Sequence, residues 1–306
     1  MKAARIHRFG GPEVIQVDDV QTPEPGRGEL RVRVLASSVN PVDWKIRQGG
    51  FVGEDKLPIT LGRDVCGTVD ALGADAVSFE LGDTVFAMLP FEVGGNAEFA
   101  AAKCDIFAPK PDRLDPVQAG SLGLAALTAW QGIFDHGGLR RGQRILIHGA
   151  AGGVGHLAVQ FAAASGAEVF ATCAGEDVDF VRSLGARVVI DYKTQRFEDL
   201  AKNMDVVFDL VAGETQDRSW SVLREGGIIV STLTEPDRNK ASEHGARGAH
   251  YMAQPNGEQL REVARLIDDG VVTPHVARVL SLAEVAEAHR LLQQGHVRGK
   301  VVLRAA

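Results

Sequence analysis

The chain has 306 residues and a mass of 32.7 kDa, about twice the commonest domain size, which predicts two domains or one large divided core. Hydrophobic residues make up 45% of it and charged residues 24%, so disordered, fibrous and disulfide-stapled proteins are excluded. A net charge of -7 gives no basic surface for nucleic acid or an anionic membrane, and neither is expected as a partner.

Three cysteines, Cys66, Cys104 and Cys173, are odd in number and widely spaced, and fit neither a disulfide framework nor a CxxC zinc site. They favour a reducing compartment, and we predict a cytoplasmic location. The first residues lack the apolar region of a signal peptide, and no stretch approaches about eighteen consecutive apolar residues. We therefore expect neither a signal peptide nor a membrane span.

The first part of the chain is predicted to be rich in β-strands. Apolar and polar side chains alternate over residues 29–36, with Leu30, Val32, Val34 and Ala36 on one face, as in a half-buried antiparallel strand. Shorter apolar runs at 65–72, 84–88 and 97–102 are separated by turns that contain Gly or Pro. These strands indicate a compact β-rich domain.

The pattern changes at Asp115, which precedes a proline and an apolar helical pattern, as a capping residue does. Beyond it, Val- and Ile-rich strands alternate with helices, which is typical of βαβ units in a parallel sheet covered on both faces. Two further helices, at 256–270 and 282–295, precede a final strand at 300–304. The sequence thus predicts a second domain of the doubly wound α/β class.

Residues 144–164 form a predicted strand, glycine loop and helix. The loop carries an A-x-G-x-x-G pattern formed by Ala150, Gly152, Gly153, Val154 and Gly155. In this pattern Gly152 lets the backbone approach a pyrophosphate, Gly155 allows close packing of helix on strand, and the helix N-terminus attracts negative charge. The alternative is a glycine turn needed only for packing. We predict a dinucleotide-binding loop.

The next strand, 168–172, ends in Thr172 and is followed by Ala174, two residues predicted to line the cofactor. An NAD enzyme usually carries Asp or Glu here to bind the ribose 2′-hydroxyl, and that acid is missing. We therefore predict NADP as the cofactor. Two observations argue for NAD instead. The acidic run at 176–179 would repel a 2′-phosphate, and no basic residue follows the strand at once to bind one.

Four segments suggest a family. They are SSVNPVDWKIRQG at 37–49, LGRDVCGTVDALG at 61–73, LTAWQGIFDHGGLRRGQRILIHGAAGGVG at 127–155 and AEAHRLLQQGHVRGKVVL at 286–303. Through them the chain resembles, over almost its whole length, the zinc-independent quinone oxidoreductases of the medium-chain dehydrogenase/reductase superfamily. The resemblance implies a GroES-like β-rich catalytic domain at 1–115 and 275–306 and a Rossmann domain at 116–274.

The same resemblance bears on metal binding. Zinc alcohol dehydrogenases of the superfamily place a Cys where this chain has Asn40, and a His-Glu pair where it has Arg63 and Asp64. Both principal ligand positions are therefore lost, and no metal is expected. Without a Lewis acid, hydride removal from an ordinary alcohol loses a major catalytic contribution, whereas an electrophilic quinone or enone needs less assistance.

By the resemblance, Asn40 lies near the nicotinamide, where its amide could orient the substrate or stabilise a developing oxyanion. Its alternative role is that of a turn residue before Pro41. Asp43 is a candidate for proton relay, or else a carboxylate that bonds to local backbone N–H groups. Both are predicted catalytic residues.

The resemblance also extends the set of cofactor-binding residues. Thr128 is expected near the nicotinamide ribose, although a threonine within a helix can instead bond to its own helix. Tyr192 is expected beside the adenosine 2′-phosphate, or is an ordinary turn aromatic. Thr232 and Leu233 follow a strand at the carboxyl edge, where open α/β sheets bind ligands, or simply begin a loop.

We therefore predict an enzyme that reduces quinones or α,β-unsaturated carbonyls with NADPH. The alternative is a non-enzymatic NADPH-binding protein with a structural or interaction role, because fold does not establish function. Family resemblance and the position of 227–231 near an expected sheet edge predict a homodimer. Neither the physiological substrate nor the proton donor can be predicted from these residues.

Overall fold

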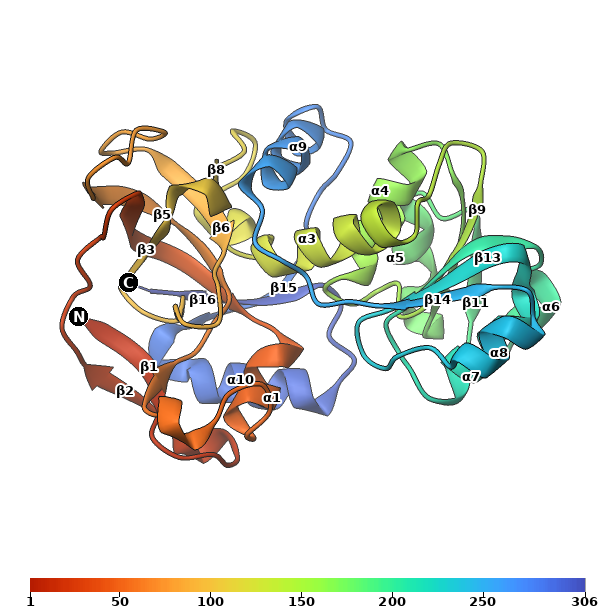
Figure 1. Cartoon of the computed structure of the whole chain (residues 1–306), viewed down its shortest axis with the longest axis horizontal. Coiled ribbons are helices and arrows are strands. Elements are labelled where there is room, and N and C mark those ends of the chain that lie inside the picture. Colours follow the sequence, from red (N-terminus) through yellow and green to blue (C-terminus); the bar gives the residue numbers. More distant parts are fainter. Residues whose placement is uncertain (306) are drawn as a thin grey trace. The chain divides into compact units, whose positions relative to one another are not determined.

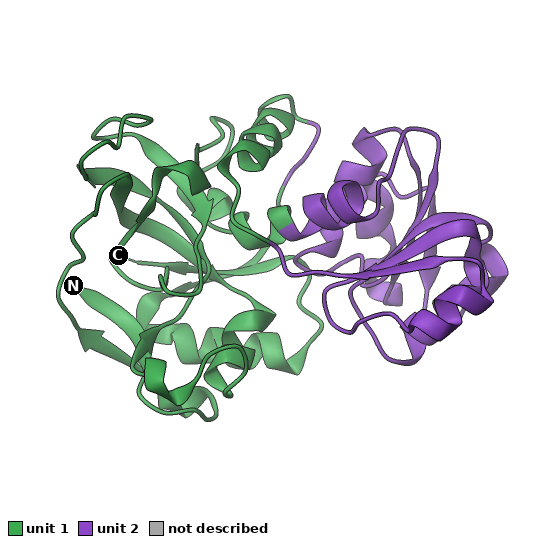
Figure 2. Cartoon of the chain, in the orientation of Figure 1, with its two compact units in different colours: residues 1–127, 254–270, 274–306 green, residues 128–253, 271–273 purple. Residues whose placement is uncertain are grey.

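The computed structural model describes residues 1–305, which form two compact units (Figure 2). Unit 1 comprises residues 1–127, 254–270 and 274–306, and unit 2 comprises residues 128–253 and 271–273. The chain thus starts in unit 1, forms unit 2 and returns. Within residues 1–305 no helix has the length and apolar character needed to cross a bilayer.

Unit 1 is built on two sheets. The larger one has the strand order β15-β16-β3-β5-β6-β8, and β7 pairs with β3 outside this order. Its strands are β3 (Glu29–Val39), β5 (Asp64–Leu72), β6 (Thr84–Met88), β7 (Phe99–Lys103), β8 (Phe107–Pro109), β15 (Val276–Ser281) and β16 (Lys300–Arg304). The smaller sheet has the order β2-β1-β4, formed by β1 (Lys2–Ile6), β2 (Ile15–Asp19) and β4 (Ile59–Thr60).

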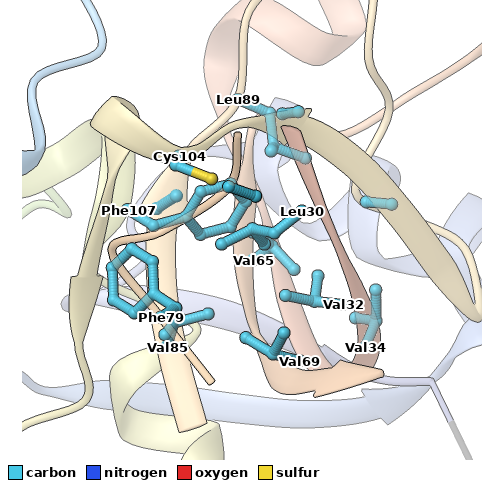
Figure 3. Packing of buried hydrophobic residues seen from close by; sticks show 14 residues of the cluster. Leu30, Val32, Val34, Val65, Val69, Phe79, Val85, Leu89, Cys104 and Phe107 are labelled. Carbon is cyan, nitrogen blue, oxygen red and sulfur yellow. The ribbon is translucent and has the colours of Figure 1, made fainter. Parts of the chain in front are cut away.

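The predicted alternation at 29–36 is confirmed in β3. Leu30, Val32, Val34 and Ala36 are all buried, and β3 pairs antiparallel with β5, β7 and β16. Figure 3 shows Leu30, Val32 and Val34 packed with Val65, Val85 and Phe107 from neighbouring strands. Burial of this apolar face, at about 25 cal/mol per Å², is the main stabilisation of unit 1.

Unit 2 contains one sheet of six parallel strands in the order β11-β10-β9-β12-β13-β14. They are β9 (Arg144–Ile147), β10 (Glu168–Cys173), β11 (Val188–Asp191), β12 (Met204–Asp209), β13 (Leu223–Ser231) and β14 (Arg247–His250). The chain moves outward from β9 in one direction and then, from β12, in the other. This is the doubly wound Rossmann order, as predicted.

Helices cover both faces of this sheet (Figure 1). They are α4 (Gly155–Ala164), α5 (Val178–Ser183), α6 (Phe197–Leu200), α7 (Glu214–Ser219) and α8 (Arg238–Glu243). Because crossovers are right-handed, α4 and α5, which follow strands moving one way, lie opposite α7 and α8, which follow strands moving the other way. The middle residues of the central strands, 145–147 in β9 and 206–208 in β12, are therefore all apolar and buried.

Unit 1 also carries helices. They are α1 (Pro41–Arg47), α2 (Pro116–Ala119), α9 (Gly257–Asp268) and α10 (Val285–Gln294), while α3 (Gly123–Trp130) runs across the boundary at residue 127. This division places 116–127 and 254–270 in unit 1, whereas the predicted boundaries at 115 and 275 place them in the Rossmann domain. The reason is close packing: a Cβ on Gly257 of α9 would lie 2.6 Å from the carbonyl oxygen of Phe107 in β8.

The last predicted strand is β16, which returns to unit 1 and pairs with β3. The segment 227–231, expected near a sheet edge, lies in β13, and β13 is paired on both sides. The edge position belongs to β14 instead. Its short polar sequence, Arg247 to His250, gives little periodicity from which a strand could have been predicted.

Candidate active site

The glycine loop of unit 2 joins β9 to α4 and folds back on itself. A Cβ on Gly155 would lie 2.2 Å from the carbonyl oxygen of Gly149 and 2.7 Å from the Cα of Ala150, so only glycine fits there. A Cβ on Gly152 would meet only the Gly149 oxygen, at 3.4 Å. The loop is thus tightly closed at Gly155 and open at Gly152, which fits the approach of a pyrophosphate to the N-terminus of α4.

A buried histidine, His148, links the strand ends beneath this loop. Its Nδ1 lies 3.0 Å from Thr172 Oγ1 and its Nε2 lies 2.9 Å from Ser219 Oγ. Ser219 donates its one hydroxyl proton to the carbonyl of Thr215, at 2.6 Å, so it accepts from Nε2–H, and Thr172 donates to Nδ1. Burial lowers the pKa of His148 to about 4. The ring is therefore neutral at pH 7, and no motif in the sequence indicated this role.

Thr172 and Ala174, predicted to line the cofactor, lie where β10 ends, and both are buried. The backbone N–H of Ala150 donates to the carbonyl oxygen of Thr172 at 3.0 Å, which ties the glycine loop to β10. Because the Thr172 hydroxyl is bonded to His148, its direct contribution here is to hold the loop in place.

Tyr192 follows β11 and is 52% exposed. Its neighbour Lys193, which was not predicted as a site residue, places Nζ 3.6 Å from the carboxylate of Glu176 in the segment after β10. Asp179 is 98% exposed and pairs with Arg182 at 2.7 Å. The acidic run that argued against a 2′-phosphate is therefore partly neutralised and partly turned outward.

The carboxyl ends of β12 and β13 are joined by Asp209, a buried residue that was not predicted. One carboxylate oxygen accepts from the N–H groups of Val211 and Ala212, at 3.0 and 2.9 Å. The other accepts from Gln216 at 2.9 Å and from Ser231 at 3.2 Å. Asp209 thus shapes the edge where Thr232 and Leu233 follow β13, and Leu233 is exposed there.

Thr128 is buried in α3, and its carbonyl oxygen accepts a hydrogen bond from the hydroxyl of Tyr251. The helix continues as a π-helical segment, Gln131–His136, a rare form that often marks functional sites. The ring of His136 stacks on Tyr251 with centroids 4.4 Å apart. Tyr251 therefore fixes this segment from the end of β14.

In unit 1, Asn40 caps α1 and is only 2% exposed. Its Nδ2 donates to Asp64 Oδ2 at 2.8 Å, and its Oδ1 accepts from Lys300 Nζ. Lys300 also lies 3.1 Å from Asp64 Oδ2, and Ser38 Oγ donates to the same oxygen. The predicted residue Asn40 is thus one member of a buried polar network whose other members come from β5, β16 and the end of β3.

Asp43 lies one turn into α1 and accepts from the backbone N–H of Asn40 at 2.7 Å, completing a capping box. Its second oxygen, Oδ1, is buried without a hydrogen-bond partner. Burial, with a contribution from the charge of Asp64, raises the pKa of Asp43 to about 7. Of the two roles predicted for Asp43, the bond to a local backbone N–H is present in the structure, and proton relay stays a prediction.

Arg63 completes the charged residues of this region. It is buried, its Nε donates to the carbonyl oxygen of Leu89 at 2.5 Å, and its guanidinium lies 3.9 Å from the ring centroid of Phe91. Burial lowers its pKa. Within residues 1–305 no three His, Cys, Asp or Glu side chains gather closely enough to hold a metal ion.

The predicted residues thus fall into two groups. Asn40 and Asp43 lie together in unit 1. The others lie in unit 2, on the glycine loop, in α3 or after the carboxyl ends of β10, β11 and β13.

Comparison with known proteins gives the family. A model described as an alcohol dehydrogenase GroES-like domain matches residues 26–140, and one described as a zinc-binding dehydrogenase matches residues 184–303. The chain is 32% identical to the quinone oxidoreductase of Mus musculus, covering 99% of this chain and 97% of that protein. It is 34% identical to a chloroplastic NADPH-dependent alkenal/one oxidoreductase of Arabidopsis thaliana, covering 99% of this chain and 79% of that protein.

A solved structure of the quinone oxidoreductase from Coxiella burnetii superposes with a TM-score of 0.91 at 34% identity, covering 100% of this chain and 99% of that one. Identity and coverage of this extent establish a shared fold and family. This protein therefore belongs to the quinone oxidoreductase family of the medium-chain dehydrogenase/reductase superfamily, and it is an enzyme of the oxidoreductase class.

Proposed function

We propose that this enzyme reduces quinones or α,β-unsaturated carbonyls with NADPH, without a metal. The observation that carries the proposal is the glycine loop, which is open at Gly152 and lies between β9 and the N-terminus of α4. The named relatives act on quinones and on alkenals or alkenones, and one of them is NADPH-dependent. These names favour an enzyme over a non-enzymatic binding protein.

The residues of unit 2 fit a dinucleotide. Gly153 and Val154 would hold the pyrophosphate through backbone N–H groups, and Gly152, whose own N–H donates to the carbonyl oxygen of Gly149, would leave space for it. Thr232, Leu233 and Thr128 would contact the nicotinamide half. When bound, the reduced nicotinamide supplies the hydride. The protein's own contribution is to hold the strand ends around the loop, through His148 at β9 and β10 and through Asp209 at β12 and β13, so that little ordering is needed on binding.

NADPH is the proposed cofactor because no acid ends β10 to bind a free 2′-hydroxyl. Tyr192 is exposed and Lys193 lies next to it, so a 2′-phosphate would find an aromatic hydroxyl and an ammonium there. Lys193 would exchange its contact with Glu176, 3.6 Å away and exposed, for a stronger one to the phosphate.

Asn40 is the proposed contact for the acceptor in unit 1. One of its two amide N–H groups is bonded to Asp64, and the second is available to a developing oxyanion on a quinone or enone. A metal is not part of the proposal, because the ammonium of Lys300 already bonds to both Asn40 and Asp64. The proton is proposed to come from water.

Two further predictions accompany this function. A homodimer is proposed through β14, the edge strand of the parallel sheet. A cytoplasmic location is proposed because the three cysteines are buried and no disulfide bond forms among residues 1–305.

Steady-state kinetics test the proposed function. We expect NADPH oxidation with 1,4-benzoquinone, menadione and a 2-alkenal, a higher kcat/KM with NADPH than with NADH, and negligible oxidation of ethanol. A higher kcat/KM with NADH would overturn the cofactor assignment. One zinc per chain, lost together with activity on treatment with a chelator, would overturn the metal-free reaction.

A further inference from the structure

The terminal strand of unit 1, β16, places the ammonium group of Lys300 beside the side chain of Asn40. Lys300 begins β16, and the neighbouring pair Val301 and Val39 fixes the register that brings Lys300 opposite Asn40. The turn before it requires glycine: Gly299 has a φ of 73°, and a Cβ there would lie 2.2 Å from the carbonyl oxygen of His275. The backbone thus places this lysine at a defined point, 260 residues after its partner.

The surroundings of Lys300 are unusual for a lysine. Its side chain is 4% exposed and that of Asp64 is fully buried, with 3.1 Å between Nζ and Oδ2. Lysine is almost never buried unless it is paired, because desolvation of the ammonium costs several kcal/mol. Asp64 supplies the pairing, and it also accepts from Ser38 and, at 2.5 Å, from the backbone N–H of Leu124. A buried ion pair such as Lys300 and Asp64 costs stability relative to apolar side chains, which favours a functional role for it.

The ammonium determines how the Asn40 amide is oriented. Oδ1 faces the Lys300 ammonium and Nδ2 faces the Asp64 carboxylate. A rotation of the amide by half a turn would place its NH2 group against the ammonium and its oxygen against the carboxylate, so both contacts would become repulsive. A lysine and an aspartate on opposite sides of one amide thus leave it a single low-energy orientation.

We propose that Lys300 is a positioning residue for the reaction: it holds the Asn40 amide so that the second N–H of Nδ2 points consistently at the acceptor. This inference rests on the proposed contact between Asn40 and the acceptor. Lys300 itself does not touch the substrate and acts through Asn40. A merely structural lysine would contribute to stability and leave the activity of the folded enzyme unchanged.

The test is a double-mutant cycle on the full chain. Lys300→Met is made in the wild type and in the Asn40→Ala background, and kcat and KM for menadione and the Kd for NADPH are measured. We expect Lys300→Met to lower kcat on the order of a hundredfold in the wild type, with Kd for NADPH changed less than about twofold. In the Asn40→Ala background the further loss should be less than about threefold, because the group that Lys300 orients is gone.

Lys110→Met is the matched control. Among residues 1–305 its ammonium donates only to the backbone oxygens of Pro111 and Leu114, both at 2.7 Å, so its removal should leave kcat unchanged. If Lys300→Met does not fold, the double variant Asp64→Asn/Lys300→Met takes its place, since it leaves no unpaired buried charge. It should fold and remain slow.

The possible failures are distinguishable. Full activity of Asn40→Ala would refute the proposed acceptor contact and, with it, this inference. An impaired Asn40→Ala in which Lys300→Met still causes its full loss refutes only the positioning role. A wild-type kcat in folded Lys300→Met, or in the double variant Asp64→Asn/Lys300→Met, also refutes the positioning role alone.

Discussion

Gly152 and Gly155 stand three positions apart in one loop and should respond differently to a side chain. Gly155→Ala places a Cβ 2.2 Å from a backbone oxygen, so we expect a loss of roughly 1–3 kcal/mol of stability and a lower Tm. Gly152→Glu has room for its Cβ but brings a carboxylate to the pyrophosphate, so the variant should fold and fail to bind NADPH.

Thermal melts and calorimetric titration check this pair, with Gly152→Ala as the control that adds a methyl group without charge. NADPH affinity preserved in folded Gly152→Glu would show that the loop serves packing alone. An unchanged Tm for Gly155→Ala would contradict the close approach described at that position.

The raised pKa of Asp43 predicts how the free energy of unfolding depends on pH. Its pKa rises from 3.8 to about 7 on folding, so the folded state binds more protons than the unfolded state between these values. The contribution of Asp43 to stability is therefore complete below about pH 4 and is lost as the pH rises through 7. In Asp43→Asn this loss is absent, and the stability of the variant relative to the wild type should increase from pH 5 to pH 8.

Chemical denaturation midpoints at several pH values measure this difference. Asp19→Asn is the control, because that exposed carboxylate has a pKa below its usual value and cannot produce the same trend. A constant difference between Asp43→Asn and the wild type across this range would refute the prediction.

At the level of the strands and helices, His148 connects β9, β10 and α7. Its pKa falls from 6.5 to about 4 on folding, so here the unfolded state binds more protons between these values. Stability should therefore decrease as the pH falls from about 6.5 towards 4, as protonation breaks the bond that Nδ1 accepts from Thr172. His148→Leu should be less stable at pH 7.5, by about 1–3 kcal/mol, and less sensitive to acid.

Two measurements between pH 4 and 7.5 test this expectation: denaturation monitored by circular dichroism, and the affinity for NADPH, which reports on unit 2. His250→Gln, at an exposed position, should retain the acid sensitivity of the wild type. Equal acid sensitivity of His148→Leu and the wild type would mean that this ring does not control the stability of the strand ends.

These elements also indicate how far the sequence could be interpreted. The alternation in β3 and the strand, glycine loop and helix at 144–164 are local patterns, and both were predicted correctly. Periodicity predicted α9 as a helix but could not tell which unit it packs on, because that depends on the fit of Gly257 against β8. Local pattern determines the element, and long-range packing determines its neighbours.

The same division applies to the candidate site. Asn40 and the loop glycines belong to short motifs, so they could be predicted as candidates from the sequence. Lys300 lies 260 residues from Asn40, and nothing in its own surroundings in the sequence distinguishes it from an exposed lysine at the start of a strand. Lys193 could have been found, since it directly follows Tyr192, but its contact with Glu176 depends on how β10 and β11 align.

For the whole molecule, the edge strand β14 leads to a prediction about assembly. Its outer side has no partner strand among the residues that the structure describes, so the backbone N–H and C=O groups of that side can pair with the same strand of a second copy. Light scattering should give twice the chain mass of 32.7 kDa at micromolar concentration. A mass equal to one chain at that concentration would exclude the homodimer.

The return of β16 to unit 1 has a consequence for synthesis on the ribosome. At roughly 5–20 residues per second, Lys300 follows Asn40 by about 13–50 seconds, whereas residues 128–253 of unit 2 are made without interruption. During that interval Asp64 has no ammonium beside it, and β3 lacks the strand that later pairs with Val39. The nascent chain can therefore assemble its glycine loop well before the network around Asn40, and we expect a chain truncated before residue 300 to bind NADPH without reducing a quinone.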